Sequence, residues 1–522
     1  MSPSFNLIAK PWIPVLWHGE SQTREISLRE ALARAPDIVE ISDPSPLVTA
    51  ALYRLLLAIC HRVWGPDSEE SWADLWAADA FDTDDLDRYL DRWRNRFDLF
   101  DSERPFYQAP GLPESVATTV AKLGHELASG NNPALFDHSL DDVPVALDPG
   151  GTARLLVALQ GFALGGLITR LKGDPPSAEA SHLIKAAIQV VTGNNLFETL
   201  VLNMLPVDED TGPLNMNPAT NIPAWESEPA KPEARMPAGF VDLLTWQSRR
   251  VLLFPGADGQ VERAAIMAGF SMPAGWSIED MEPMVTFVLR ESRNQYPWAP
   301  VGFRPEQALW RQSATLLEHA KERGRRAQAL SWLNTLRNAG YLDRDAVGLS
   351  LFGLASDRAK IFLWREERLP LPLAYLENPD LVAELDKAVG AARSTATALR
   401  RTTWSMASET LGPGGTADRD RASSLADSLA PERAYWPRLD EPFRRYMLDL
   451  ATSYASDSAG TTGLQWLEAV RGAATSAFEA AATAIETSSR GYRAAALYRP
   501  RFQGEVRRVL NEFMPTQEEV TA

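Results

Sequence analysis

Apolar residues spaced three and four positions apart dominate the last third of the chain, and this spacing places side chains on one face of an α-helix. The clearest series is Leu467, Val470, Ala474, Phe478, Ala481 and Ile485. A stripe of this length must be buried against other helices, because on its own it would expose a large apolar surface to water. The series therefore predicts that this part of the chain folds as a packed group of helices.

Three further helices of the same kind are expected around it. Asn378 and Pro379 form a helix start, since Asn caps free backbone N–H groups and Pro fits the first turn. Another helix begins near Pro442, and the last follows Gly491 and is interrupted by Pro500, which we expect to kink it. Four amphipathic helices joined by short breaks favour an antiparallel four-helix bundle.

The residues before these helices mix strand-like and helix-like patterns, so the predicted fold class is α+β. Ser27 and Glu30 form a capping box at a helix start, and a long apolar helix is expected over residues 46–63. We predict a large mixed α/β N-terminal domain over residues 1–372 and the four-helix bundle over residues 373–522.

The chain is acidic, with 52 Lys and Arg residues against 69 Asp and Glu residues and a formal net charge of −17. Residues 67–110 hold −8 of this charge, which we interpret as a solvated acidic face because the ligand spacing of a calcium loop is absent. An acidic balance argues against a nucleic-acid partner unless the charge is unevenly distributed. No apolar run reaches the roughly 20 residues of a membrane span. The N-terminus also lacks a secretory pattern, so a cytoplasmic protein without a membrane partner is expected.

The common sequence motifs of enzymes are missing. The single cysteine, Cys60, lies in an apolar run and is interpreted as a buried hydrophobe, which leaves neither a disulfide nor a cysteine zinc cluster. The six histidines form no His-x-x-x-His pair, and the nucleophile-elbow, phosphate-loop and dinucleotide patterns are absent. We therefore expect a protein that is not an enzyme and that holds no cofactor and no metal.

Two basic stretches interrupt the acidic chain. Residues 321–360 carry a net charge of +4, and residues 490–508 carry +5. Each stretch alone is best explained as a solvated basic face. The two together raise an alternative, a basic surface that binds the phosphates of a nucleic acid. A hairpin with its tip at residues 354–359 is predicted in the first stretch. Such a tip is either an ordinary surface turn or an element that enters a nucleic-acid groove.

Short blocks in a constant order carry a resemblance to a known family. They lie at residues 6–8, 12–15, 103–108, 192–193, 200–205, 223–225, 239–241 and 246–247. Together with the two-domain layout, they resemble CasA, the large subunit of the type I-E CRISPR surveillance complex Cascade. The likeness covers essentially the whole chain, and the order of the blocks carries it rather than any single block.

The resemblance implies a non-catalytic subunit of a ribonucleoprotein. It implies a place beside the guide RNA (crRNA) with the other Cascade subunits, and recognition of the PAM in double-stranded target DNA from the minor groove. The subunit would then start strand separation with a wedge at a hairpin tip and help to recruit the helicase–nuclease. Because the minor groove presents a degenerate pattern, acceptance of several PAM sequences is expected.

Two DNA-binding elements of the family correspond to positions in this chain. The wedge corresponds to Ser356, Asp357, Arg358, Ala359 and Lys360. The glycine-rich loop corresponds to residues 173–181, with Gly173, Ser177 and Ser181 as the contacts. This loop departs from the family pattern, because one glycine remains and two prolines remove N–H donors from it.

Two further family elements are less well matched. Residues 260–300 contain no lysine, so Arg290 and Arg293 are the candidates for the family's lysine finger. The loop that contacts the guide RNA and neighbouring subunits corresponds to Leu135, Phe136, Asp137 and His138, with Phe136 as the anchor. The cysteine cluster with which some relatives hold zinc is missing, which agrees with the expectation of no metal.

Two other classes of function stay open at this point. One is a hydrolase whose acidic residues converge in a cleft, which the missing motifs disfavour. The other is a pure protein-interaction scaffold, which predicts no salt-dependent affinity for DNA.

Overall fold

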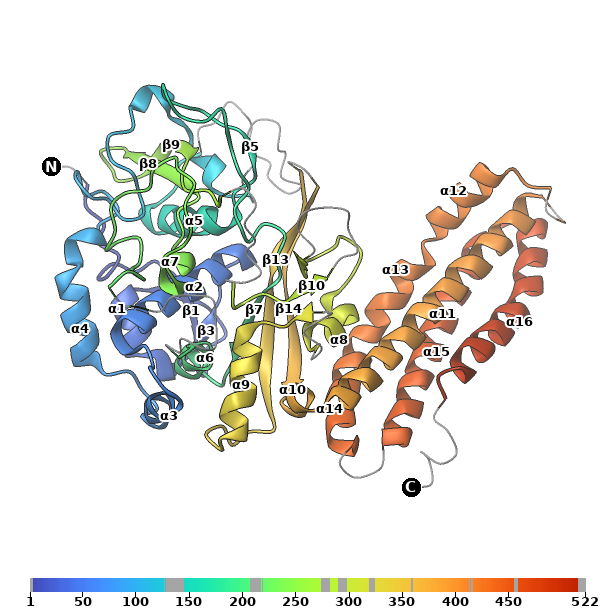
Figure 1. The fold of residues 1–522 in the computed structure, drawn as a ribbon. Coiled ribbons are helices and arrows are strands. Elements are labelled where there is room, and N and C mark those ends of the chain that lie inside the picture. The colour runs from blue at the N-terminus through green and yellow to red at the C-terminus, as the bar shows by residue number, and fades with distance from the viewer. Residues whose placement is uncertain are drawn as a thin grey trace. The chain divides into compact units, whose positions relative to one another are not determined.

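The computed structural model divides the chain into two compact units, and each is described here by itself (Figure 1). The mixed unit comprises residues 1–309 and 319–368, and the helical unit comprises residues 310–318 and 369–522. The described residues are 3–125, 127, 145–206, 217, 219–273, 282–289, 298–318, 324–357, 360–412, 414, 416–454 and 459–514. The mixture of helices and strands in the first unit confirms the α+β class.

The described strands lie in the mixed unit, apart from the end of the last one. They are β1 (Ile13–Trp17), β2 (Arg24–Ile26), β3 (Ile38–Ile41), β4 (Thr118–Thr119), β5 (Gly166–Leu167), β6 (Ser177–Ala178), β7 (Ile188–Thr192), β8 (Arg249–Pro255), β9 (Val261–Ala268), β10 (Phe287–Leu289), β11 (Trp298–Pro300), β12 (Gly324–Arg325), β13 (Ala346–Asp357) and β14 (Lys360–Pro372). The last strand, β14, continues four residues into the helical unit.

The helices of the mixed unit are short apart from α2 and α5. They are α1 (Leu28–Ala33), α2 (Pro46–Trp64), α3 (Glu69–Ala77), α4 (Thr83–Arg92), α5 (Pro149–Phe162), α6 (Leu196–Leu202), α7 (Phe240–Leu244) and α9 (Gln328–Asn338). Single 3-10 turns lie at η1 (Ala35–Asp37), η2 (Arg94–Arg96), η3 (Glu114–Val116) and η4 (Val120–Leu123).

Several small antiparallel sheets organise the mixed unit. Their strand orders are β2-β1-β3, β4-β9-β8, β11-β10-β12, β14-β13-β7 and the two-stranded β5-β6. In the β14-β13-β7 sheet, Gly348 of β13 pairs with Thr192 of β7. A side chain at position 348 would place its Cβ 2.1 Å from the Thr192 hydroxyl, so close approach of the two strands requires glycine there.

The helix α2 forms the centre of the core and matches the apolar helix predicted over residues 46–63. Its residues from Leu47 to Cys60 are buried, and Cys60 is a buried free thiol as expected. By length and composition alone this 19-residue helix could cross a membrane, although Arg54 interrupts its apolar run. Burial accounts for its composition, since 78% of its apolar window lies inside the protein.

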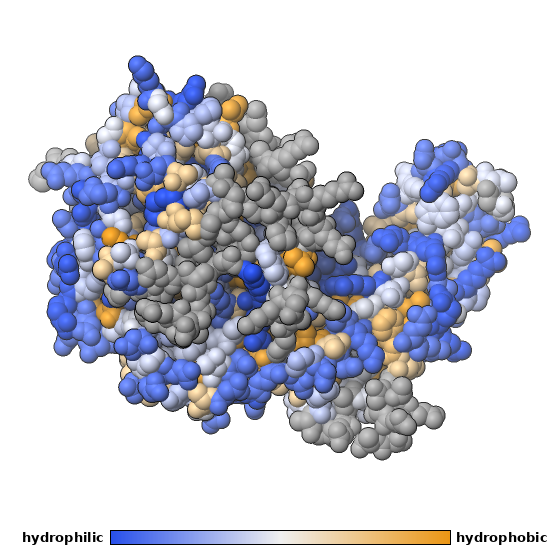
Figure 2. Space-filling model, viewed as in Figure 1, coloured by the Kyte–Doolittle hydropathy of each residue, from blue (hydrophilic) through white to orange (hydrophobic). Residues whose placement is uncertain are grey.

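The acidic residues of segment 67–110 lie mostly at helix starts and on the surface. Asp82 caps α4, accepting hydrogen bonds from the backbone N–H groups of Asp84 (2.8 Å) and Asp85 (3.2 Å). Carboxylates at a helix N-terminus stabilise it through the helix dipole. Among the described residues, no group of three or more His, Cys, Asp or Glu is placed to hold a metal. Hydrophilic residues also cover much of the visible face of each unit (Figure 2).

The helical unit contains the helices that the sequence predicts. They are α11 (Pro379–Leu411), α14 (Asp440–Tyr454), α15 (Ala459–Ile485) and α16 (Ser489–Asn511). Shorter elements accompany them, namely η6 (Leu309–Gln312), α8 (Ser313–Leu316), α10 (Ala374–Glu377), α12 (Arg419–Leu429), α13 (Pro431–Tyr435) and η8 (Trp436–Leu439). The unit is therefore more elaborate than the simple four-helix bundle of the prediction.

The local signals for these helices are largely correct. Asn378 caps α11 by accepting from the N–H groups of Asp380 and Leu381, and the whole predicted stripe of α15 is buried. Phe478 of this stripe stacks on Phe502 of α16, with ring centres 4.3 Å apart. The predicted interruption at Pro500 is wrong, because α16 continues through it.

A tryptophan outside the C-terminal sequence completes the helical core. Trp310 stacks on Phe443 with ring centres 4.4 Å apart and meets Trp466 edge to face. Its indole N–H donates to the Asp440 carboxylate at 2.6 Å. These contacts explain why residues 310–318 belong to the helical unit, which no pattern in the sequence indicated.

Candidate nucleic-acid interface

The strands β13 and β14 form one long hairpin, which is the element that the resemblance assigns to a wedge (Figure 1). Val347, Leu349 and Leu351 of β13 are buried as their alternation predicts. Leu354, Ala355 and Ser356 still belong to β13, so the turn is shorter than the predicted tip at residues 354–359. Asp357 ends β13 and Lys360 begins β14, while Arg358 and Ala359 between them lie outside the described residues.

Ion pairs and a hydrogen bond connect the residues at the base of this hairpin. Arg368 of β14 forms ion pairs with Glu366 at 2.5 Å and with Glu40 of β3 at 2.7 Å. Burial alone would lower the pKa of Arg368, but the hydrogen bonds to Glu366 and Glu40 outweigh it and raise the pKa. Glu366 also accepts a hydrogen bond from Ser350 of β13 at 3.1 Å, which ties the two strands together. The base of the hairpin is thus a rigid support for its tip.

The side of β14 near the turn carries an exposed aromatic ring. Phe362, two residues after the start of β14, is 55% exposed. The alternation of Lys360, Phe362 and Trp364 in the sequence is typical of one strand face, but nothing in it singles out Phe362. An exposed phenyl ring of this kind can stack on a base that has left its duplex.

A second, shorter hairpin is formed by β5 and β6 and contains the predicted loop residues Gly173 and Ser177. Gly173 has a φ of +98°, a left-handed conformation that favours glycine. Asp174 pairs with Arg250 of β8 at 2.6 Å and accepts from the N–H of Leu171 at 3.0 Å. Burial would raise the pKa of Asp174, but the Leu171 N–H and Arg250 lower it. The loop is therefore anchored to the β8 strand.

The prediction that Ser181 contacts DNA is wrong, because its side chain is buried and forms hydrogen bonds within the protein. It is 3% exposed, and its hydroxyl lies 2.7 Å from that of Ser248 and accepts from the N–H of Ala163 at 3.0 Å. Since Ser248 itself donates to the Gln160 carbonyl, the Ser181 hydroxyl is the donor in the pair. Ser181 is a structural residue at the base of the hairpin, unable to reach a DNA groove from this position.

Other residues of this hairpin are better placed for an external contact. Leu167 is 93% exposed, and Arg170 and Lys172 are also exposed. The sequence analysis did not single out Leu167, Arg170 or Lys172, although two basic residues close to Gly173 could have indicated a nucleic-acid contact. A cationic tip with an apolar side chain resembles the elements that proteins insert into the minor groove.

The first basic stretch is mostly tied down by contacts within the protein. Arg344 forms a double hydrogen bond with Glu198 at 2.6 and 2.7 Å. Arg325 lies over the Trp298 ring, and burial lowers the pKa of Arg326, which donates to Ser331. The described part of this stretch is therefore chiefly structural rather than an open phosphate track.

The second basic stretch, on α16, is divided between paired and unpaired arginines. Arg499 pairs with Glu479 and Glu486, and Arg508 pairs with Glu505 and Glu512. Arg490, Arg493 and Arg507 are exposed and make no ion pair among the described residues. A surface pocket of about 250 Å³ at the start of α16 is lined by Glu409, Ser489, Arg490 and Arg493.

A buried ionic cluster lies in the core of the mixed unit. Arg54 donates to Glu282 at 2.8 Å, and His182 lies 3.6 Å from the other Glu282 oxygen. Burial alone would raise the pKa of Glu282, but Arg54 and His182 lower it to about 2. Burial lowers the pKa of His182. The cluster is held by mutual charge and is almost completely buried, and it connects distant segments of the core.

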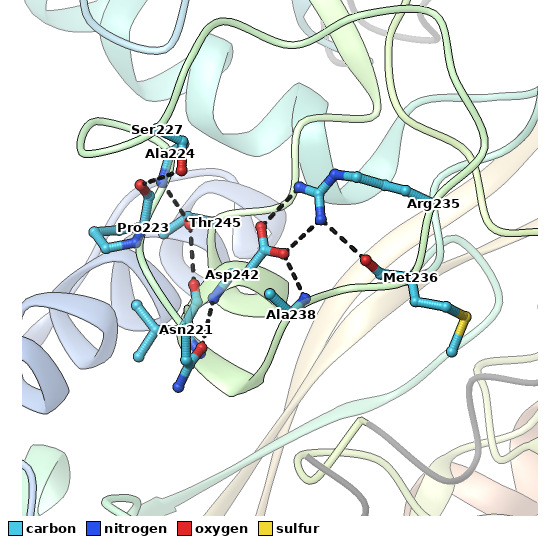
Figure 3. Close-up of polar contacts among 10 residues, drawn as sticks. Asn221, Pro223, Ala224, Ser227, Arg235, Met236, Ala238, Asp242 and Thr245 are labelled. Atoms are coloured by element: carbon cyan, nitrogen blue, oxygen red, sulfur yellow. Dashed lines mark hydrogen bonds and ion pairs between the residues drawn. The ribbon is translucent and has the colours of Figure 1, made fainter. Parts of the chain in front are cut away.

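A network of hydrogen bonds surrounds α7, and several of its residues line a second surface pocket (Figure 3). Asn221 caps α7 by accepting from the N–H groups of Val241 (2.8 Å) and Asp242 (3.2 Å). Arg235 binds both oxygens of Asp242, at 2.6 and 2.8 Å, and Asp242 also accepts from the N–H of Ala238. Two carboxylates, Asp242 and Glu228, line this pocket of about 230 Å³.

These two carboxylates do not form a hydrolase pair. Both oxygens of Asp242 are engaged by Arg235, and Glu228 pairs with Arg104 at 2.9 Å. The hydrogen bond and charge of Arg104 lower the pKa of Glu228, whereas a general acid needs a raised one. The acidic-cleft alternative is disfavoured by this pairing.

Several predicted site residues fall outside the described residues. These are Leu135, Phe136, Asp137 and His138 of the guide-RNA loop, the finger candidates Arg290 and Arg293, and the wedge residues Arg358 and Ala359. Arg290 and Arg293 lie in sequence between β10 and β11, which pair as antiparallel strands.

Comparisons with known proteins agree on one family. The family model of CRISPR-associated protein Cse1 matches residues 6–477. CRISPR-associated protein CasA/Cse1 of Thermus thermophilus is 33% identical over 514 residues, covering 94% of this chain and 95% of the relative. The crystal structure of Cse1 from Acidimicrobium ferrooxidans has 28% identity and a TM-score of 0.83, covering 99% of this chain and 100% of that one.

A chain from a structure described as a CRISPR RNA-guided surveillance complex has the same fold. It is 22% identical with a TM-score of 0.74, covering 96% of this chain and 99% of that one. The family match spans both units, and the CasA resemblance read from the sequence is confirmed. The chain belongs to the CRISPR-associated Cse1 family.

Proposed function

We propose that this protein is the non-catalytic large subunit of a CRISPR RNA-guided surveillance complex that recognises the PAM in double-stranded DNA. The subunit recognises the PAM from the minor groove of the duplex. It then starts strand separation with the β13–β14 hairpin and helps to recruit the helicase–nuclease. Its partners are the guide RNA, the other Cascade subunits and the target DNA, in the cytoplasm and without a cofactor or a metal. Membership of the Cse1 family supports the assembly.

The single observation that carries the DNA-binding role is the construction of the β13–β14 hairpin. Its base is held by the Arg368 ion pairs and by the Ser350–Glu366 hydrogen bond. The exposed Phe362 lies two residues after the start of β14. The sequence itself supplies two basic residues in this part of the chain, Arg358 and Lys360. A rigid support with a small polar and basic tip is suited to enter a groove and separate the strands of a duplex.

A gel-shift measurement on the assembled complex tests the hairpin. Arg358→Ala and Asp357→Ala should each weaken PAM-dependent binding about tenfold, because each removes one contact to the groove. Lys122→Ala, at an exposed lysine away from the hairpin, serves as the matched control. If both tip variants bind the PAM duplex as wild type does, the wedge assignment is wrong.

Strand opening can be measured separately from binding. A fluorescent base placed next to the PAM is expected to brighten when the wild-type complex binds and to brighten less with Arg358→Ala. The scaffold alternative predicts no salt-dependent DNA affinity, so a measurable slope of binding against salt concentration rejects it.

A further inference from the structure

We propose that the pocket beside α7 takes a single unpaired nucleobase of a nucleic-acid strand. The inference rests on the proposed function and deepens it, since an opened duplex and a guide RNA both present unpaired bases. The residues that carry it are Glu228, Arg235, Asp242, Gln247 and Phe270, all of which line the pocket.

The first observation is an amide without a partner. Gln247 is 5% exposed, and its side chain makes no hydrogen bond with the described residues. Its amide atoms are not completely enclosed, so they are open to a ligand in the pocket, which would replace water as their hydrogen-bond partner. An amide offers one donor and one acceptor side by side, and this pattern matches the edge of a nucleobase.

The second observation is the size and lining of the pocket. Its volume of about 230 Å³ is smaller than the roughly 300–1,000 Å³ of sites for drug-sized ligands. Phe270 forms one wall, and the Arg235 guanidinium lies 4.0 Å from the centre of that ring. Flat aromatic and guanidinium surfaces are the ones on which proteins stack single bases.

The walls are preformed by the network in Figure 3. Thr245 accepts from the N–H of Ala224 at 3.0 Å and donates to the Val241 carbonyl at 2.9 Å. Asp242 holds Arg235 through both of its oxygens. Because these side chains are already fixed, binding requires little ordering of the pocket.

The distribution of charge favours a base over a phosphate inside the pocket. The cation in the lining, Arg235, is neutralised by Asp242, so the described interior offers no open site for an anion. Cations gather instead around Glu228, where Arg104, Arg96 and Lys231 all lower its pKa. A base inside and its flanking phosphates near Arg96 and Lys231 would match this arrangement.

A peptide from another subunit is the rival occupant, because a peptide group also pairs with an amide. A peptide backbone carries no regular negative charge, so it would form no ion pairs with Arg96, Arg104 and Lys231. The charge pattern therefore favours nucleic acid.

Binding of short single strands to the full-length protein tests the proposal. The probes are an oligonucleotide with one 2-aminopurine and the same strand with an abasic position instead, each made as DNA and as RNA. Gln247→Met removes the amide while keeping the side-chain length, and it is expected to weaken binding of the base-containing strand about tenfold. The abasic strand is expected to bind wild type and Gln247→Met equally weakly.

A rim variant keeps the test valid if Gln247→Met unfolds. Lys231 is exposed, and Lys231→Ala is expected to weaken binding of the strand and to reduce the salt dependence of binding. Lys122→Ala, at another exposed lysine, is the matched control and is expected to have no effect. Tighter binding of the RNA probe would assign the guide RNA as the source, and tighter binding of the DNA probe would assign an opened target strand.

Two results would overturn the inference. One is equal affinity of wild type for the base-containing and abasic strands. The other is unchanged strand binding by a folded Gln247→Met protein that no longer co-purifies with a neighbouring subunit, which would assign the pocket to a peptide. The PAM-dependent gel shift of the wild-type complex is a separate measurement, so failure of the proposed function and failure of the pocket are distinguishable.

Discussion

Arg54 of α2 donates a hydrogen bond of 2.8 Å to Glu282, a residue 228 positions further along the chain, and both side chains are almost fully buried. Arg54 also donates to the Leu243 carbonyl at 3.2 Å. The pair therefore connects the core helix with two later segments of the mixed unit. Buried charges of this kind are stable only while each has its partner.

Breaking this pair is expected to destabilise the mixed unit strongly. Glu282→Gln leaves Arg54 charged and buried without its counter-ion, so the free energy of unfolding should fall by about 3–5 kcal/mol. Urea unfolding measures this change. The double variant Arg54→Met with Glu282→Gln should recover some of the loss, and Asp85→Asn in the exposed Arg88–Asp85 pair should change stability by less than about 1 kcal/mol.

Ser181→Ala should affect folding rather than DNA binding. The substitution removes two buried hydrogen bonds, to Ser248 and Ala163, and is expected to lower the free energy of unfolding by about 1–3 kcal/mol. Gel shifts of the assembled complex at a temperature where the variant is folded should match wild type. A selective loss of PAM-dependent binding would restore Ser181 to the DNA contacts.

Stability should fall on acidification because of His61. Both ring nitrogens of His61 are buried without a hydrogen bond to the described residues, and burial lowers its pKa to about 4. Its ordinary pKa of roughly 6.5 applies in the unfolded chain, which therefore binds the proton first as the pH falls. The stability contributed by neutral His61 is present above a pH of about 6.5 and is lost progressively between about 6.5 and 4.

The size of this effect can be measured by unfolding at two pH values. From about pH 7 to about pH 5, His61 alone should reduce the free energy of unfolding by roughly 2 kcal/mol. His61→Phe, which keeps an aromatic ring against Phe240, should flatten the pH dependence. His182, whose pKa burial also lowers, should contribute a slope in the same direction, which remains in the His61→Phe variant. An unchanged pH profile in the variant would contradict the assignment.

The arginines of α16 should differ in their contribution to DNA binding. Arg493→Ala and Arg507→Ala remove exposed charges that have no ion pair among the described residues. If they contact phosphates, each should reduce the slope of log affinity against log salt by about 0.9 for duplex DNA. Arg508→Ala is the control, since Glu505 and Glu512 already neutralise Arg508. Equal slopes for all three variants and wild type would exclude this face from DNA binding.

Some of the candidate site could be read from the sequence, and the rest could not. The hairpin at β13–β14 was predicted because alternation of apolar residues such as Leu349 and Leu351 is a local signal. Gly173 was assigned to a loop through the resemblance to the family, and its φ of +98° agrees with a turn. Ser181, by contrast, looks like any polar loop residue until Ser248, 67 positions away, is found against it.

Local patterns in the chain were enough to identify the class of fold, the helices α11 and α15, the Asn378 cap of α11 and the family. They succeed because helix periodicity and capping depend on residues within a few positions of one another. Three features required the folded molecule: the Arg54–Glu282 pair, the Trp310 contact with Phe443, and the partly neutralised arginines of α16. Each depends on contacts between segments that are distant in sequence, and burial and pairing at those contacts determine which charged residues remain available to a nucleic acid.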